Sequence, residues 1–320
     1  MKSNHCNFYV YGGVFGMKKL GVFLPMRSSL TRFDRHNPGI FLEDVGNAIL
    51  AELRKSFELV EGLNFLKASV RDGVVFFGGL DSTQLDGFVW FSQMDRYSDS
   101  HDFLVLRQLE KSMPVMNPTR GLEIGVDKFK TSSFLKEKGL PAPKFALLES
   151  GDEESIEWVF NNWGSVLVKP RFGFFGLGIF KADNADEFLD LLDYSGQSSA
   201  YVEKFYENDF NDWCSVNVVG GKVLYGFAKQ PEKIKGFKVL DRKQTGGKTI
   251  ERKPDKEQEK IALRVAMETG LDFLGVDIIK SVEGEYLVVD VNTFPGIYTE
   301  IMPAAQIAGE FARAVRQKVQ

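Results

Sequence analysis

The sequence predicts an α/β (α+β) fold, because apolar runs of strand length alternate with segments whose apolar residues recur at helical spacing. Its 320 residues are enough for two or three domains with cores of their own. Hydrophobic residues make up 43% of the chain and charged residues 26%, which are ordinary values for a soluble globular protein. There is no internal repeat and no low-complexity segment. We therefore expect a small set of globular domains.

Charge, cysteine content and hydropathy exclude several classes of protein. The net charge of -4 provides no overall positive field for nucleic acid. The two cysteines, Cys6 and Cys214, are too few for a disulfide framework or a zinc site, which suits a reducing compartment. The most apolar N-terminal stretch is interrupted by Lys18 and Lys19 and lacks the features of a membrane span or a signal peptide. We therefore expect a cytoplasmic protein that binds neither nucleic acid nor membrane.

The first 120 residues predict an N-terminal α/β domain. Residues 1–16 are expected to be an extension or an upstream start, because Met17 and the apolar run after it form a natural start for the first strand. The elements expected are a strand at 18–25, a helix at 41–56, a strand at 57–65 and apolar runs at 74–78 and 87–93. Pro114 and Pro118 mark the connection that ends this domain, 1–120.

The rest of the chain predicts two further lobes, 121–200 and 201–320. Capping residues and closing glycines indicate helices, and short turns between alternating strands indicate hairpins. In the smaller lobe we expect a helix at 127–139, an extended segment at 140–150, a strand at 165–171, a glycine-rich loop at 173–178 and a helix at 184–195 capped by Asn184. In the larger lobe we expect a strand at 200–206, a hairpin at 212–230 turning at Gly220 and Gly221, a helix at 255–270, a second hairpin at 273–292 and a last helix from Pro303.

Oxygen-bearing side chains gather at the end of the second hairpin. Asp290 and Asn292 are two residues apart on one strand and share a face, whereas Val289 and Val291 are expected to point into the core. Pairing across the turn brings Asp277 close to Asp290 in either nearby register. Mg²⁺ prefers such oxygen ligands and commonly combines one or two carboxylates with nucleotide phosphates. The pattern indicates a metal site, although an isolated Asp290 would more simply cap the turn that follows it.

Two lysines and a glycine-rich loop lie upstream of the hairpins. Lys169 ends an apolar strand, and the loop after it contains Gly173, Gly176 and Gly178. Glycines let backbone N–H groups approach phosphates closely, and Lys128 supplies a second positive charge. Because the lysine precedes the glycines, the loop is not a P-loop and is a weak indication alone. Together with the metal site it predicts a nucleoside triphosphate bound with Mg²⁺.

Positive charge is concentrated between Lys229 and Lys253, where nine lysines and arginines stand against three acids. A solvated basic loop is the simpler interpretation of this segment. The alternative is a loop that closes over an anion, which the lysines and the metal site would favour.

Five motifs in this order resemble the ATP-grasp superfamily, and within it the carboxylate–amine ligases such as ribosomal-protein glutamate ligases, glutathione synthetase and D-alanine–D-alanine ligase. The motifs are DKFKTSSFLKEKGLPAPKF, VLVKPRFGFFGLGIF, YVEKF, GVDII and LVVDVNTFPGI. The resemblance extends from about Gly121 to the C-terminus. It implies an ATP-grasp fold, in which an N-terminal open α/β domain precedes two lobes that clasp the nucleotide.

The resemblance also implies roles for individual residues. These are Lys128 and Lys169 for the α- and β-phosphates, Gly173, Gly176 and Gly178 for the loop over them, Glu203, Lys204 and Phe205 for adenine, Asp212 or Asp209 for ribose, Asp277, Asp290 and Asn292 for Mg²⁺, and Lys238 and Arg242 for the γ-phosphate and the acyl phosphate. Two Mg²⁺ ions are expected, with Mn²⁺ as an alternative.

The activity implied is that of an ATP- and Mg²⁺-dependent carboxylate–amine ligase that forms an amide or peptide bond through an acyl phosphate. The substrates would be a small carboxylate and an amine, such as an amino acid, a short peptide or a sugar acid. A small-molecule kinase and a nucleotide-binding module without turnover are the alternatives. Asp290 favours the module, since the family usually has Glu at this position. Family members are often dimers or tetramers, so a homo-oligomer is one expectation.

Overall fold

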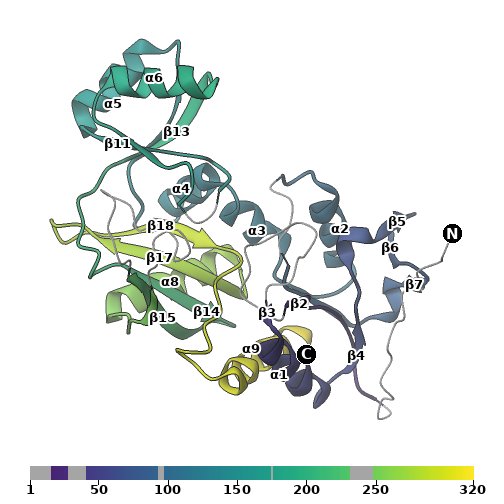
Figure 1. The fold of residues 1–320 in the computed structure, drawn as a ribbon. Helices are drawn as coiled ribbons and strands as arrows, with labels where there is room; N and C mark the ends of the chain where they lie inside the picture. Colours follow the sequence, from purple (N-terminus) through teal and green to yellow (C-terminus); the bar gives the residue numbers. More distant parts are fainter. Residues whose placement is uncertain (1–15, 28–40, 93–96, 174–175, 231–247) are drawn as a thin grey trace.

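The computed structural model describes residues 16–27, 41–92, 97–173, 176–230 and 248–320. These residues form an N-terminal parallel sheet, a small antiparallel lobe and a larger antiparallel lobe (Figure 1). The mixed α and β organisation that the alternating pattern predicted is confirmed. Among the described residues, no helix combines the length and apolar character needed to cross a bilayer.

The N-terminal sheet is parallel and has the strand order β4-β1-β8-β9. Its strands are β1 (Lys19–Phe23), β4 (Glu58–Glu61), β8 (Gly87–Trp90) and β9 (Val115–Met116). Helix α1 (Glu43–Arg54) and the C-terminal helix α9 (Ala304–Val319) pack together on one face (Figure 1). The close approach of α9 requires a glycine at position 87, where a Cβ would lie 2.9 Å from a methyl group of Val319. The last helix therefore completes the core of the first domain.

Short elements and helix α2 (His101–Glu110) cover the other face of this sheet. The short elements are η1 (Phe65–Lys67), an antiparallel sheet of β5 (Ser69–Arg71), β6 (Val74–Phe77) and β7 (Leu80–Asp81), and η2 (Ser82–Gln84). The paired strands β2 (Met26–Arg27) and β3 (Phe41–Leu42) lie against α1 instead. One sequence prediction was wrong in part, because the strand expected at 57–65 ends at Glu61. The apolar run at 74–78 contributes β6 to a separate antiparallel sheet.

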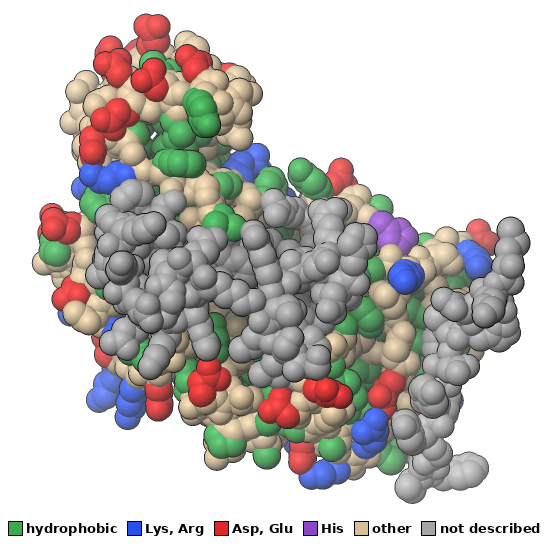
Figure 2. Space-filling view, viewed as in Figure 1, with side chains coloured by type: hydrophobic (Ala, Val, Ile, Leu, Met, Phe, Trp, Pro, Cys, Tyr) green, Lys and Arg blue, Asp and Glu red, His purple; other side chains and the backbone are tan. Residues whose placement is uncertain are grey.

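The small lobe is a four-stranded antiparallel sheet of order β10-β13-β11-β12, covered by two helices (Figure 1). Its elements are β10 (Phe145–Glu149), α5 (Glu153–Trp163), β11 (Val166–Lys169), β12 (Phe180–Ala182), α6 (Ala185–Ser195) and β13 (Ser199–Lys204). Asn184 caps α6 as predicted, because its side chain accepts from the Glu187 N–H. Acidic residues open both helices, where the helix dipole favours negative charge, and acidic side chains gather on this lobe (Figure 2).

The large lobe is a five-stranded antiparallel sheet of order β16-β15-β14-β17-β18. Its elements are β14 (Cys214–Val219), β15 (Lys222–Gln230), β16 (Lys248–Glu251), α8 (Lys256–Thr269), β17 (Phe273–Lys280) and β18 (Tyr286–Asn292). Both predicted hairpins and the helix between them are confirmed. Along β17, Val276 and Ile278 pack in the core beneath α8, whereas Asp277 and Ile279 line a cleft on the other face. The sheet therefore presents polar side chains on the side away from α8.

Helices α3 (Thr119–Gly125) and α4 (Lys128–Glu137) connect the first domain to the lobes. Helix α4 corresponds to the predicted helix at 127–139. Asp127 caps it, because its carboxylate accepts from the Phe129 N–H at 3.0 Å. Position 128 is therefore the first residue of a capped helix.

Asn117 fastens the first domain to the large lobe. Its side chain is buried, its Nδ2 donates to Phe273 O at 2.7 Å, and its Oδ1 accepts from the N–H groups of Asp272 and Phe273, both at 2.8 Å. Its carbonyl accepts from Trp90 Nε1 at 3.2 Å. The end of β9 is thereby tied to the start of β17, the strand that carries Asp277.

Replacing Asn117 by Ala would remove three hydrogen bonds and leave backbone groups of Asp272 and Phe273 without these partners. We expect the free energy of unfolding, measured by urea denaturation, to fall by about 2–4 kcal/mol. Asn162 is exposed and donates only to Trp158 O in the described structure, so N162A should change stability by less than about 0.5 kcal/mol. Equal losses in the two variants would contradict the role given to Asn117.

Candidate active site

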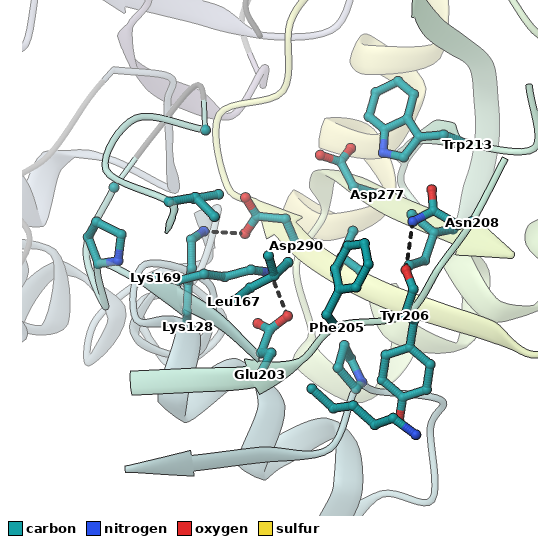
Figure 3. Close-up of a pocket in the computed structure, with 18 of the residues that line it drawn as sticks. Lys128, Leu167, Lys169, Glu203, Phe205, Tyr206, Asn208, Trp213, Asp277 and Asp290 are labelled. Atoms are coloured by element: carbon teal, nitrogen blue, oxygen red, sulfur yellow. Dashed lines mark hydrogen bonds and ion pairs between the residues drawn. The ribbon is translucent and has the colours of Figure 1, made fainter. Parts of the chain in front are cut away.

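A cleft lies between the sheet of the small lobe and the sheet of the large lobe, and side chains from both converge on it (Figure 3). Many of the residues singled out in the sequence line this cleft. They are Lys128, Lys169, Gly173, Gly176, Glu203, Lys204, Phe205, Asp277 and Asp290. Residues from α4, β11, β13, β17 and β18 therefore meet at one place, as the motif order predicted.

Lys169 and Glu203 form a buried ion pair on neighbouring strands of the small lobe. Lys169 Nζ lies 2.5 Å from Glu203 Oε2, and the two side chains are 6% and 4% exposed. Tyr201 Oη donates to Glu203 Oε1 at 2.8 Å and lies 2.7 Å from Ser132 Oγ. Burial and the negative charge of Glu203 raise the pKa of Tyr201, so its phenol stays protonated and donates. This network holds the Lys169 ammonium at the cleft wall.

Lys128 forms the second ion pair, with Asp290 on the opposite lobe. The Lys128 Nζ to Asp290 Oδ1 distance is 2.8 Å (Figure 3). Burial acts to lower the pKa of Lys128, but the charge and hydrogen bond of Asp290 outweigh it, so the pKa is raised. Lys128 therefore keeps its charge within the cleft.

Asp277 and Asp290 are directly paired in the register of β17 and β18, as the hairpin predicted. Burial and the neighbouring Asp290 carboxylate raise the pKa of Asp277, while Ser215, Lys229 and Asn292 act in the opposite direction. Asp277 Oδ1 is buried and has no hydrogen-bond partner among the described residues. Two carboxylates are thus held side by side, and one of them has a buried oxygen that no described group contacts.

A β-bulge at Val289 determines which side chains face the cleft. Asp277 pairs with Asp290, but the next residue, Ile278, pairs with Val288, so Val289 is the extra residue of β18. The expectation that Val289 points into the core was therefore wrong. Val288 and Val291 are in the core, and Val289 lines the cleft beside Asp290.

The oxygen donors at this point suit a divalent cation. The buried oxygen of Asp277 lacks a partner, Asp290 lies opposite it, and the Asn292 side chain acts on Asp277 by hydrogen bonding. Within the described parts of the chain there is no group of three or more His, Cys, Asp or Glu side chains that could hold a metal. A cation would therefore depend on two carboxylates, one amide and groups supplied by a ligand. The metal assignment stays a prediction.

Several predicted residues are not among the described residues of the cleft wall. They are Gly178, Asp212, Asn292, Lys238 and Arg242. Gly178 has a φ of +74° and lies where a Cβ would be 2.8 Å from Pro170, so it shapes the loop rather than the wall. Asp212 is exposed. Lys238 and Arg242 lie outside the described residues.

The backbone at the predicted adenine edge is partly occupied. Lys204 N–H donates to Lys144 O at 2.8 Å, and Phe205 N–H donates to Ser165 O at 2.9 Å. An adenine base could accept hydrogen bonds from these two N–H groups only if their present hydrogen bonds to Lys144 O and Ser165 O were broken. The carboxylate of Glu203 is likewise held by Lys169 and Tyr201, so the adenine contacts assigned to these residues remain predictions.

Lys229 is a charged residue of the cleft to which the sequence assigned no role of its own. It lies near the end of β15, lines the cleft, and its charge acts to lower the pKa of Asp277. It belongs to the basic segment 229–253, in which the family resemblance implied Lys238 and Arg242 for the γ-phosphate. Its position near the end of a strand, like that of Lys169, was the signal available in the sequence.

Comparisons with known proteins agree with this geometry. Residues 125–315 match the model of the RimK-like ATP-grasp domain. The tetrahydromethanopterin:α-L-glutamate ligase of Methanocaldococcus jannaschii is 30% identical over 200 residues, which are 60% of this chain and 66% of that protein. The coenzyme γ-F420-2:α-L-glutamate ligase of the same organism is 28% identical over 187 residues, 57% of this chain and 62% of that protein. The matched region thus spans slightly less than two thirds of these relatives.

A solved structure confirms the fold over nearly the whole chain. The ATP-grasp ligase PsnB, in complex with a minimal precursor, Mg and ADP, superposes with a TM-score of 0.64 at 17% identity. The superposition covers 97% of this chain and 100% of that chain. The predicted ATP-grasp fold is therefore present, including the N-terminal α/β domain.

The raised pKa of Asp277 predicts that its charge destabilises the ligand-free protein. When the pKa of a carboxyl group is higher in the folded state than in the unfolded state, the free energy of unfolding falls as the pH rises from the unfolded pKa to the folded pKa. We expect D277N to raise the free energy of unfolding at pH 7.5 by about 1 kcal/mol or more, and to have little effect at acid pH. Urea denaturation from about pH 4, near the ordinary pKa of Asp, up to about pH 8 measures this.

Asp190 is an exposed carboxylate on α6, and D190N provides the matched control. Addition of MgCl₂ should stabilise the wild type more than D277N. A D277N protein that is less stable than wild type across this pH range would contradict the destabilising effect assigned to the Asp277 charge.

Proposed function

The chain belongs to the RimK-like ATP-grasp family, and from this premise we propose that it is an ATP-dependent ligase that joins a carboxylate to an amine. Two relatives are named as α-L-glutamate ligases, so we propose L-glutamate as the amine substrate. Their names give two different acceptors, tetrahydromethanopterin and coenzyme γ-F420-2, so the acid is left to experiment.

The observation that carries this proposal is the arrangement of charge in one cleft. Lys128 and Lys169 approach from the side of the small lobe, and Asp277 and Asp290 lie on the sheet of the large lobe (Figure 3). Two ammonium groups suit the α- and β-phosphates of ATP, and the carboxylates suit the cation that accompanies a triphosphate.

The apolar part of the same cleft suits a planar base. Leu167 and Ile179 of the small lobe and Tyr206 after β13 line it, next to Lys204 and Phe205. Such a mixture of apolar walls and few polar groups is typical of a nucleotide pocket. We place adenine here, with the triphosphate extending toward Lys128 and Asp290.

Asp277, Asp290 and Asn292 would hold Mg²⁺, and two ions would accompany the nucleotide. Bound Mg²⁺ would neutralise phosphate charge and orient the γ-phosphoryl group. The unpartnered buried oxygen of Asp277 supports this assignment, because it supplies an acceptor that no described protein group uses. Lys229 lines the cleft beside Asp277 and would donate to the γ-phosphate.

The reaction would proceed in two displacements. A carboxylate oxygen of the acid attacks the γ-phosphorus, the bond to the β-phosphate oxygen breaks, and ADP and an acyl phosphate form. The amine nitrogen then attacks the acyl carbon, the C–O bond to phosphate breaks, and the amine loses a proton. The lysines would hold the phosphates in line and stabilise their charge, which are the main contributions a protein makes to phosphoryl transfer.

The proposal is tested by supplying L-glutamate, ATP and Mg²⁺ with a panel of candidate acids and measuring ADP and phosphate. We expect ADP formation to require an acid, and hydroxylamine to trap the acyl phosphate as a hydroxamate. A phosphorylated acceptor without amide would indicate a kinase instead. ATP binding without turnover on every acid would indicate a binding module. ATP hydrolysis that ignores all acids would contradict a ligase.

Lys229→Met provides a second test. Loss of one preorganised donor to the transferring phosphoryl group should lower kcat by about 10²-fold or more, with a smaller change in the KM for ATP. Lys222 begins the same strand with a side chain that is 60% exposed, so K222M serves as the control and should retain wild-type kinetics. Equal kcat values in the two variants would remove Lys229 from the reaction.

A further inference from the structure

The two lysines of the cleft belong to different elements, and something must fix their relative position. Lys128 is the first residue of α4, and Lys169 is the last residue of β11. A helix and a strand share no ladder of hydrogen bonds that would set their register. The contacts between the start of α4 and the segment after β11 converge on Arg171.

Arg171 forms an ion pair with Asp127, the residue that caps α4. Its Nη2 lies 2.5 Å from Asp127 Oδ2, and its Nε donates to Asp127 Oδ1 at 3.3 Å, so the contact is bidentate. The Asp127 side chain is only 2% exposed. The backbone makes a return contact, since Lys128 N–H donates to the Arg171 carbonyl at 2.9 Å. The residues next to Lys128 and Lys169 are thus joined through both side chain and main chain.

Aromatic rings restrict the Arg171 guanidinium further. It lies 5.9 Å from the ring centre of Phe129 and 5.3 Å from that of Phe172. The ring of Phe172 in turn lies 5.5 Å from that of Tyr97 in the N-terminal domain. Arg171 is not among the described residues that line the cleft, and its guanidinium donates to the Asp127 carboxylate. The Arg171 side chain therefore does not point into the cleft as a direct phosphate ligand would.

We propose that Arg171 is a positioning residue that, through Asp127, sets the distance between Lys128 and Lys169 and so matches the two ammonium groups to the α- and β-phosphates of ATP. This inference rests on the proposed function, because it takes both lysines to bind the triphosphate. It follows that the Arg171–Asp127 pair acts on nucleotide affinity although neither residue touches the nucleotide.

The test is calorimetric binding of Mg²⁺ and a non-hydrolysable ATP analogue to the wild type, R171M, R171K, D127N and the double variant R171M/D127N. We expect the Kd to rise about tenfold or more in R171M, and by an intermediate amount in R171K, since an ammonium cannot reproduce the bidentate fork. The double variant should bind no more weakly than the weaker single variant, because both changes break one contact. In turnover, the KM for ATP should rise while the KM for L-glutamate stays the same.

Arg54→Met is the matched control, because it breaks a surface pair with Glu61 at 2.5 Å in the N-terminal domain. It should leave the Kd unchanged. The inference is overturned if R171M melts like the wild type and binds the analogue equally well, or if the losses in the double variant add. Should R171M fail to fold, R171K decides, and an unchanged Kd in R171K overturns the inference too. If the wild type does not bind the analogue, the proposed function is overturned as well. If the wild type and the variants bind it equally, only this inference is overturned.

Discussion

The pairing of Asp277 with Asp290 across β17 and β18 is the constraint around which this cleft is built. Two carboxylates held side by side repel each other, and the buried Asp277 oxygen without a described partner costs free energy that other interactions of the fold must offset. Lys128 compensates Asp290, and Lys229 acts on Asp277 only through its charge. A binding site accounts for such an arrangement better than stability does, because a cation would relieve both costs at once.

The scaffold keeps these side chains in place from several directions. Strand β17 is paired on both sides, with β14 and β18, and Asn117 fixes its first residues to the N-terminal domain. Helix α9 returns to pack on α1, so the end of the chain closes the core of its beginning. The wall that carries Asp277 is therefore anchored to both of its neighbouring strands and to the N-terminal domain. On the opposite side, Lys169 lies on β11, which is also paired on both sides, and the Arg171–Asp127 pair joins the residue before Lys128 to the segment after β11.

Local patterns predicted what depends on local geometry. The Asp277–Asp290 pair follows from one hairpin turn, and the α6 cap follows from one Asn. The side of the sheet on which the Val289 side chain lies could not be predicted. The extra residue in β18 reverses the alternation of side chains between the two faces, and only the pairing of β17 with β18 reveals it. The Lys169–Glu203 pair could not be predicted either, because it requires β13 to lie beside β11 although a helix separates them in the chain. Helices α2, α3 and α5 were overlooked, although Asp152 and two glutamates mark the start of α5.

The Lys128–Asp290 ion pair affects how the proposed ligands would bind. Lys128 cannot contact a phosphate fully while it holds Asp290, and Asp290 cannot turn both oxygens to a cation while Lys128 occupies one. A nucleotide that draws Lys128 away leaves Asp290 to the cation, and a cation that takes Asp290 leaves Lys128 to the phosphates. Each ligand would therefore strengthen the binding of the other by the same factor, as thermodynamic linkage demands. The Lys128–Asp290 pair would thus favour the complex of metal and nucleotide over either ligand alone.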